Sequence, residues 1–164
     1  MQITIYTIGF TGKSAEEFFA LLQNAGVRAL VDVRENRVGQ LSGFSKYPDI
    51  EFFLKTIAGV SYRHAPELAP SREIRQAYQR TKKWEEYEPR FLALMRERRA
   101  IARVEPFKEK TALLCSEPGP EKCHRRLVAD LLAEKWRGEG HRVDVQHLVT
   151  TKAKPAKKRA SKVK

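Results

Sequence analysis

The sequence has no long apolar run and little cysteine. No stretch approaches the roughly 18 apolar residues that a membrane-spanning helix needs. The start, MQITIYTIGF, lacks the basic segment and apolar run of an export signal. We therefore expect a cytoplasmic location and no membrane partner. The 164 residues include two cysteines, which we expect to be free thiols because the cytosol keeps thiols reduced.

Acidic residues are missing from the C-terminal segment TKAKPAKKRASKVK, residues 151–164. It holds six Lys and one Arg, so it carries +7 of the formal net charge of +12 and leaves +5 for residues 1–150. Without apolar periodicity it cannot offset its ordering entropy by burial, and we expect residues 149–164 to form a disordered basic tail. Lys157, Lys158 and Arg159 are its candidate nucleic-acid contacts, because a cation at a phosphate releases counterions. A solubilising tail is the alternative.

Strand and helix patterns alternate over most of the remaining chain. Ser14 and Glu17 form a capping box before a helix that should stop at Gly26. A second helix is expected within residues 47–59, and a third within 122–136. The expected strands are ITIYTIGF (3–10), ALVDVR (29–34), VSYRHAPEL (60–68), TALLC (111–115) and RVDVQHLV (142–149).

The segment 69–107 has no strand pattern and predicts two or three helices, which Pro89 should divide. Trp84 and Tyr87 are then expected in the turn before Pro89. Such aromatic side chains usually pack between helices. Stacking on nucleotide bases is the alternative.

This order predicts the α/β class. We expect a single three-layer domain over residues 1–148, with a mainly parallel sheet of about five strands and helices on both faces. In such sheets ligands bind outside the carboxyl ends of the strands.

Polar residues gather at those expected strand ends. Asp32, His64, Cys115 and Glu117 are the candidate catalytic residues. An unpaired Asp32 within its apolar strand would be costly, so it should be buried and paired with an arginine, either Arg34 or Arg125.

Arginines near the same ends predict an anion site. Arg34, Arg37, Arg125 and Arg126 are the candidates, because the planar guanidinium suits phosphate and carboxylate groups. Holding neighbouring loops together is the structural alternative for such arginines.

The stretch LLCSEPGPEKCHRRLVADLL, residues 113–132, allows three interpretations. A zinc site is disfavoured, because the spacing of Cys115, Cys123 and His124 matches no compact zinc motif and the sulfurs should lie on opposite sides of the turn. We therefore expect no metal and no cofactor. A Cys115 thiolate near a helix N-terminus is the second interpretation.

The third interpretation is a rigid connection from strand to helix. Two prolines in SEPGPEK remove amide donors, so the loop is a poor oxyanion cradle. Arg125 or Arg126 should then point back to the strand ends and hold Glu117 or an anion. Cys123 and His124 should pack, which leaves His64 as the better catalytic histidine.

Several stretches together resemble the domain of unknown function 488 family. They are YTIGF, SAEEFFALL, VDVRENR with SGFSK, GVSYRHAPEL, WEEYEPRF, and ALLCSEPGPEKCHRRLVADLL leading to VQHL. The resemblance covers about residues 3–148 and implies an α/β domain without an assigned activity. The basic tail lies outside it.

Two function classes follow. The first is a nucleic-acid-associated protein, with DNA or RNA as its partner, that binds nucleic acid and acts on a nucleotide or base at an arginine-lined anion site. The second is a small-molecule enzyme that uses a Cys115 thiolate and Arg125 for phosphoryl or sulfur chemistry. A binding module without catalysis is a third option.

Overall fold

Five parallel strands form one sheet in the order β3-β2-β4-β1-β5, as expected from the alternating patterns. The computed structural model describes residues 1–39 and 43–151. The strands are β1 (Gln2–Gly9), β2 (Ala29–Asp32), β3 (Ser61–His64), β4 (Thr111–Cys115) and β5 (Arg142–Leu148). All five residues of the central strand β4 are buried, because helices cover both faces of the sheet.

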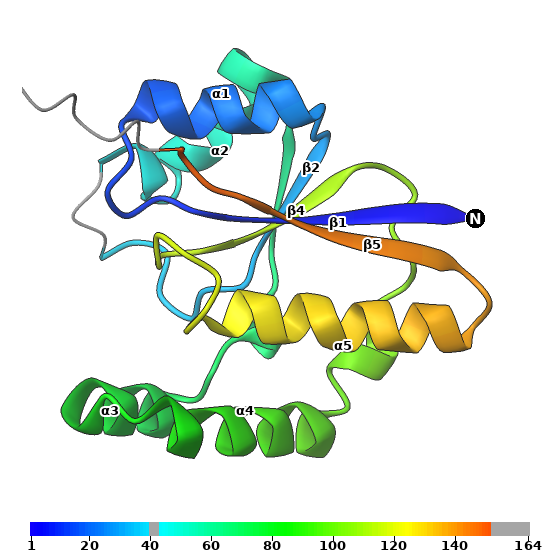
Figure 1. Cartoon of the computed structure of the whole chain (residues 1–164). Helices are drawn as coiled ribbons and strands as arrows, with labels where there is room; N and C mark the ends of the chain where they lie inside the picture. The colour runs from blue at the N-terminus through cyan, green and yellow to red at the C-terminus, as the bar shows by residue number, and fades with distance from the viewer. Residues whose placement is uncertain (40–42, 152–164) are drawn as a thin grey trace, which may run out of the picture.

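Helices lie on both sides of the sheet (Figure 1). α1 and α2 cover one face, while α5, and beyond it α3 and α4, lie on the other. The α-helices are α1 (Ala15–Ala25), α2 (Asp49–Phe53), α3 (Arg72–Thr81), α4 (Trp84–Arg98) and α5 (His124–Gly138). Shorter helical turns span Gly43–Ser45, Leu54–Ala58, Pro66–Leu68 and Ile101–Arg103. None of the helices in the described residues is long and apolar enough to cross a membrane.

Two apolar cores separate the three layers. Phe18 and Leu22 of α1 pack with Ile50 of α2 on one face. Phe91 of α4 and Trp136 of α5 belong to the core on the other. Burial of these side chains is the main favourable contribution to folding.

The limits of α1 agree with the sequence. The Ser14 side chain accepts from the Glu17 amide, and the Glu17 carboxylate accepts from the Ser14 amide. Gly26 ends the helix in the left-handed conformation, with φ 70°, which glycine adopts without steric cost.

Pro89 does not divide the segment 69–107, contrary to expectation. It lies inside α4, and the break falls earlier, at Lys82, whose φ is 55°. Pro89 removes only a bond to the carbonyl of Glu85, and both residues are exposed, so water can replace it. Trp84 and Tyr87 therefore lie in the first turn of α4, where their rings stack with centroids 4.9 Å apart.

Asp32 is fully buried at the end of β2 and paired with Arg34, as predicted. Its carboxylate accepts from Arg34 Nε at 2.8 Å and Nη2 at 2.7 Å, and from the Tyr62 hydroxyl at 2.7 Å. Arg34 Nη2 also donates to the carbonyl of Ser45. The ion pair thus ties β2 to β3 and to the segment before α2.

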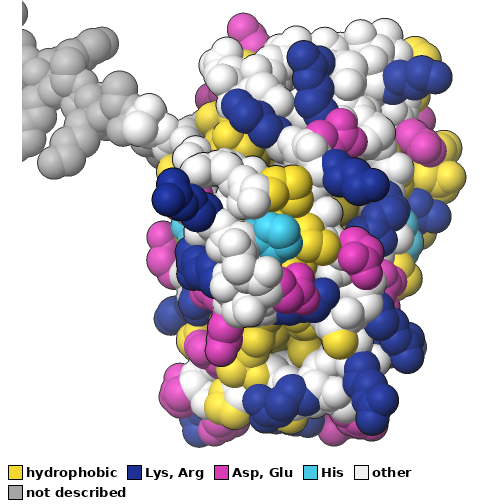
Figure 2. Space-filling model, turned by 90° about the vertical axis from the view of Figure 1, so that its right-hand side faces the viewer, with side chains coloured by type: hydrophobic (Ala, Val, Ile, Leu, Met, Phe, Trp, Pro, Cys, Tyr) yellow, Lys and Arg dark blue, Asp and Glu magenta, His cyan; other side chains and the backbone are white. Residues whose placement is uncertain are grey.

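The charge on one face of the domain is mixed. Figure 2 shows the side at which β1 begins, where Lys and Arg side chains alternate with Asp and Glu and no large area has one sign. Residues 152–164, and with them Lys157, Lys158 and Arg159, lie outside the described residues.

Asp32→Ala should lower the free energy of unfolding by about 3 to 5 kcal/mol, because it leaves the buried Arg34 guanidinium without its counter-charge. Asp144→Asn is the control: Asp144 is exposed and accepts a hydrogen bond from Gln2, so its change should cost no more than about 1 kcal/mol. Denaturant titration measures both variants. Equal losses would show that the buried pair contributes nothing specific.

Candidate functional site

A cavity of about 400 Å³ opens at the carboxyl ends of β2 and β4. Its walls come from the segment after β2, the loop between β4 and α5, and the facing ends of α3 and α4. This is where the parallel-sheet rule places ligands.

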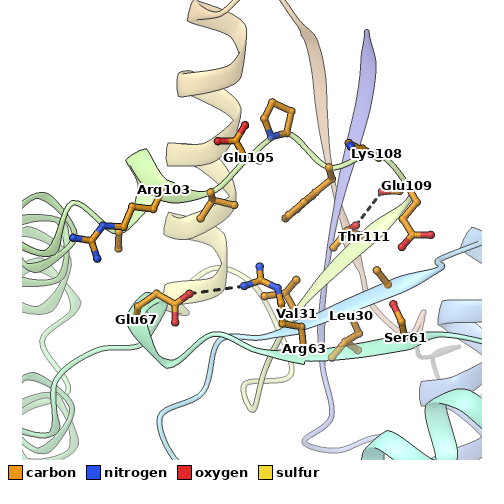
Figure 3. A pocket seen from close by; sticks show the side chains of 15 residues that line it. Leu30, Val31, Ser61, Arg63, Glu67, Arg103, Glu105, Lys108, Glu109 and Thr111 are labelled. Carbon is orange, nitrogen blue, oxygen red and sulfur yellow. Dashed lines mark hydrogen bonds and ion pairs between the residues drawn. The ribbon is translucent and has the colours of Figure 1, made fainter.

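A larger cavity, of about 980 Å³, lies at the opposite end of the sheet, where β2, β3 and β4 begin (Figure 3). Its charged side chains include Arg63 and Glu67, which form an exposed pair at 3.8 Å, and the Thr111 hydroxyl donates to the Glu109 carbonyl. No His or Cys is among its lining residues. The smaller cavity therefore contains the better candidates for chemistry.

Cys115 lies at the base of the smaller cavity as the last residue of β4. Its side chain is 4% exposed. It pairs in register with Gly9 of β1, where the chain passes very close: a Cβ on Gly9 would lie 1.6 Å from the Glu117 carbonyl oxygen. Only glycine permits the loop after Cys115 to turn back over β1.

His124, the first residue of α5, faces Cys115. Its Nδ1 lies 3.5 Å from Cys115 Sγ, and its Nε2 lies 2.8 Å from the carbonyl oxygen of Val33. A carbonyl can only accept, so Nε2 carries a proton and donates it. Nδ1 is then free to accept from the Cys115 thiol or, when protonated, to donate to its thiolate.

Cys123 completes a cluster with these two residues. The two sulfurs and a ring nitrogen of His124 lie within 4.8 Å of one another, and all three residues are buried. Both cysteines are free thiols. The expectation that the sulfurs lie on opposite sides of the turn is therefore wrong. The prolines between them stiffen the loop without preventing it from reversing.

The two thiols differ in acidity. A hydrogen bond from the Cys123 thiol, with the charges of His124 and Arg125, holds the pKa of Cys115 well below its usual range, although burial opposes this. Burial, together with the neighbouring Cys115 thiolate, raises the pKa of Cys123 well above its usual range. Cys115 is therefore the thiol of the pair that ionises first, and its thiolate is the one that forms.

The same thiolate affects its other neighbours. Burial is the largest single effect on the pKa of His124 and lowers it, but the Cys115 thiolate and the hydrogen bond to the Val33 carbonyl together outweigh it, so the net shift is upward. Burial raises the pKa of Glu117, and the Cys115 thiolate raises it further. Glu117 is thus the candidate acid of the cavity wall.

Arg125 lies behind the cysteines and does not line the cavity as an exposed anion ligand. It is 0% exposed. Its Nη1 donates to the Glu117 carbonyl at 2.6 Å and contacts Cys123 Sγ at 3.5 Å. Nε and Nη2 have no partner among the described residues. The predicted tie to Glu117 exists, but through the backbone.

The other predicted residues lie farther from the chemistry. His64 Nε2 donates to the Arg34 carbonyl at 2.7 Å, and His64 does not line the cavity, so His124 replaces it as the candidate catalytic histidine. Arg37 stacks on Tyr47, 3.6 Å from the ring centroid. Arg126 pairs with Asp130 of α5 at 3.2 Å and with Glu88 of α4 at 3.8 Å. Arg34 does line the cavity.

Sequence interpretation missed part of the site. It left Cys123 and His124 as packing residues. It also did not consider α3, which contributes Arg75 and Tyr78 to the cavity, or Lys82, which follows the helix directly. One signal was available: residues at the two ends of a short loop between a strand and the following helix are necessarily near each other.

The cysteine and histidine cluster could also hold a soft metal ion. Two thiolates and an imidazole are zinc or copper ligands. A tetrahedral site would need a fourth ligand from outside the three clustered residues. The absence of a metal stays a prediction.

Comparison with known proteins gives the family. The model of the family described as "Domain of unknown function DUF488" matches residues 14–132. The chain belongs to this family. No curated protein matches, and no solved structure matches. The matched range includes the whole Cys115, Cys123 and His124 cluster, while β1 and β5 lie outside it.

In a Cys123→Ser variant, which keeps a hydroxyl donor beside Cys115, alkylation of Cys115 by iodoacetamide should remain fast as the pH falls through about 8.5, where an ordinary thiol loses its thiolate. When His124→Gln is added, the pH at which the alkylation rate is half its maximum should rise, because the imidazolium that stabilises the thiolate is gone. Rates across pH, with the unfolded variant as control, measure this. A folded midpoint equal to the unfolded one would contradict the lowered pKa.

Proposed function

We propose that this protein is an enzyme of sulfur chemistry, in which the Cys115 thiolate attacks a small-molecule sulfur electrophile. The observation that supports this most directly is the contact of Cys115 Sγ with His124 Nδ1 at 3.5 Å, at the base of a cavity of about 400 Å³. A nucleophile with a partner that stabilises its anion is the usual arrangement for covalent catalysis. Since Cys115 is only 4% exposed, a small molecule suits the site better than a protein.

Arg125 gives an independent argument for the thiolate. A guanidinium stays charged in proteins, and a buried charge without a counter-charge is strongly destabilising. Arg125 is 0% exposed and forms no ion pair with a carboxylate in the described part of the chain. The group in contact with it that can ionise is the Cys123 thiol, and the charge of Arg125 also helps to lower the pKa of the adjacent Cys115 thiol. A thiolate in this pair is therefore the natural counter-charge of Arg125.

The second cysteine favours thiol–disulfide exchange. Cys115 Sγ attacks one sulfur of a substrate R–S–S–R, forms the mixed disulfide and releases the first RS⁻. Cys123 then loses its proton and attacks Cys115 Sγ, which forms the Cys115–Cys123 disulfide and releases the second RS⁻. Two thiols of the protein are oxidised and one disulfide of the substrate is reduced. Two external thiols, which are themselves oxidised to a disulfide, restore the reduced pair.

Phosphoryl transfer, the other chemistry considered for Cys115, has less support. It needs donors that surround the transferred group. Pro118 and Pro120 remove two backbone donors from the loop beside Cys115. A second thiol within 4.8 Å has no role in that reaction, whereas sulfur exchange uses it.

A chromogenic aromatic disulfide tests this assignment, because the chain has only two cysteines. The native protein should release about two thiol equivalents per chain, one for each step of exchange. Cys123→Ser should release about one and keep the reagent as a mixed disulfide, visible as an added mass. Cys115→Ser should lose the fast phase, because Cys123 alone has a raised pKa.

A Cys115→Ser protein that reacts as fast as the native one would refute Cys115 as the nucleophile. Metal analysis of the purified protein is the companion measurement. We expect much less than one zinc per chain. One zinc per chain would contradict exchange if a chelator that removes the zinc also abolished the difference in reactivity between Cys115 and Cys123. The cluster would then be a metal site.

Nucleic-acid association is the second candidate function, and it rests on the composition of the tail. Seven of the excess positive charges lie in residues 151–164, and this segment has no acid. Such an arm can bind phosphates without a folded interface. The mixed charge of the face in Figure 2 gives no additional support there.

Removal of residues 151–164 should weaken binding to duplex DNA and flatten its salt dependence. Each phosphate that the arm neutralises contributes roughly 0.9 to the slope of log affinity against log salt. Filter binding at several salt concentrations measures the slope, and thermal unfolding checks that the domain is intact. An unchanged slope would exclude the arm as the binding element.

A further inference from the structure

The helix α3 forms the wall of the cavity opposite the cysteines. Arg75, Tyr78, Gln79 and Lys82 all line the cavity. Arg75, Tyr78 and Gln79 are spaced three and four residues apart, which puts them on one side of α3. Lys82 follows directly after the last residue of the helix, in the left-handed conformation. The wall therefore has a cation at each end and an aromatic ring between them.

The cations on this wall have donors to spare. Arg75 Nη2 pairs with Glu35 at 3.2 Å, but its Nε is buried and has no partner among the described residues. Lys82 lies near the Tyr78 ring, with Nζ 5.8 Å from the centroid, and forms no ion pair in the part of the chain that the structure describes.

Arg34 lines the cavity from the segment after β2. The residue is 4% exposed, and two of its nitrogens are fully used by Asp32 and Ser45. Its guanidinium lies over the Phe10 ring, 5.1 Å from the centroid. Arg34 is therefore balanced by Asp32, and the free cations of the cavity must come from elsewhere.

Four cationic side chains line the cavity, Arg34, Arg75, Lys82 and Lys122, against two carboxylates, Glu35 and Glu117. Glu35 is already paired with Arg75. The pKa of Glu117 is raised, first by burial and then by the Cys115 thiolate, although Arg125 and Lys82 act to lower it. The cavity thus combines spare cationic donors with aromatic surface from Tyr78 and Trp84.

We infer that the substrate of Cys115 carries an oxyanion group, a carboxylate, sulfonate or phosphate, which Arg75 of α3 and the following Lys82 bind. The rest of the substrate contacts Tyr78 and Trp84. This inference rests on the proposed function, because it concerns the molecule that Cys115 attacks. Arg75 and Lys82 are binding residues, and the thiolate remains the reacting group.

Iodoacetate and iodoacetamide form a matched pair of probes for this inference. Both alkylate a thiolate and are similar in size, but only iodoacetate carries a carboxylate. In the Cys123→Ser variant Cys115 is the one thiol that can react. The ratio of the two rate constants, compared with the ratio for a free cysteine peptide, isolates recognition of the anion from reactivity of the thiolate.

The folded protein should raise this ratio at least about tenfold over the peptide, the effect expected of one charge-assisted hydrogen bond. Lys82→Gln should lower it. The double change Glu35→Gln with Arg75→Gln should also lower it, although the net charge of the cavity is unchanged. Arg80→Gln is the control, because Arg80 is exposed on the same helix but lies outside the cavity. The ratio for this variant should equal that of the Cys123→Ser protein without further changes.

Each outcome is decisive. A folded ratio equal to the peptide ratio overturns the inference and leaves the proposed function intact, because Cys115 still reacts. If Lys82→Gln and Arg80→Gln lowered the ratio equally and the double variant did not lower it, the anion would respond only to the net positive charge of the protein. That result would also overturn the inference. If neither reagent modifies folded Cys115, the proposed function fails, and this inference fails with it.

Discussion

The buried charge of Arg125 is the constraint on which the site depends. Its guanidinium lies under the loop that joins β4 to α5 and donates to the Glu117 carbonyl at 2.6 Å. That bond holds the loop back over Gly9, where no side chain would fit. The same reversal brings Cys123 and His124 against Cys115. One interaction therefore fixes the loop and brings a positive charge close to both sulfurs.

The opposite acidities of the cysteines follow from this arrangement and affect folding in opposite directions. The pKa of Cys115 is lowered in the folded state, so its contribution to stability is present above the pKa of the unfolded thiol, about 8.5, and is lost as the pH falls through the folded value. The pKa of Cys123 is raised. Its contribution is present below about 8.5 and is lost as the pH rises through the folded value. The two thiols therefore stabilise the folded protein most when Cys115 has lost its proton and Cys123 keeps its own.

Periodicity and capping residues were enough to predict the sheet and α1, because strands and helix ends depend on neighbours in the sequence. The rule for strand ends likewise found Cys115, Glu117 and Arg34. Prediction failed where a side chain depends on distant backbone. His124 is oriented by the carbonyl of Val33, 91 residues away, and no local pattern encodes that bond. The prediction from Pro89 was wrong because the free-energy cost of a proline inside a helix depends on whether water can reach the carbonyl that loses its hydrogen bond. The sequence does not show that exposure.

Arg34 and Arg125 show two solutions to the same physical problem. Arg34 is neutralised by the buried carboxylate of Asp32, and the pair links β2, β3 and the segment before α2. Under the proposed function, Arg125 instead depends on a thiolate that the reaction consumes. Whenever Cys115 forms a covalent bond, the thiolate disappears and the buried guanidinium loses its counter-charge, which is costly. Every adduct on Cys115 is thereby destabilised relative to the free thiolate, and release of the adduct is favoured. A buried arginine without a carboxylate is a poor device for stability, but it suits an enzyme that must return its nucleophile to the ionised state.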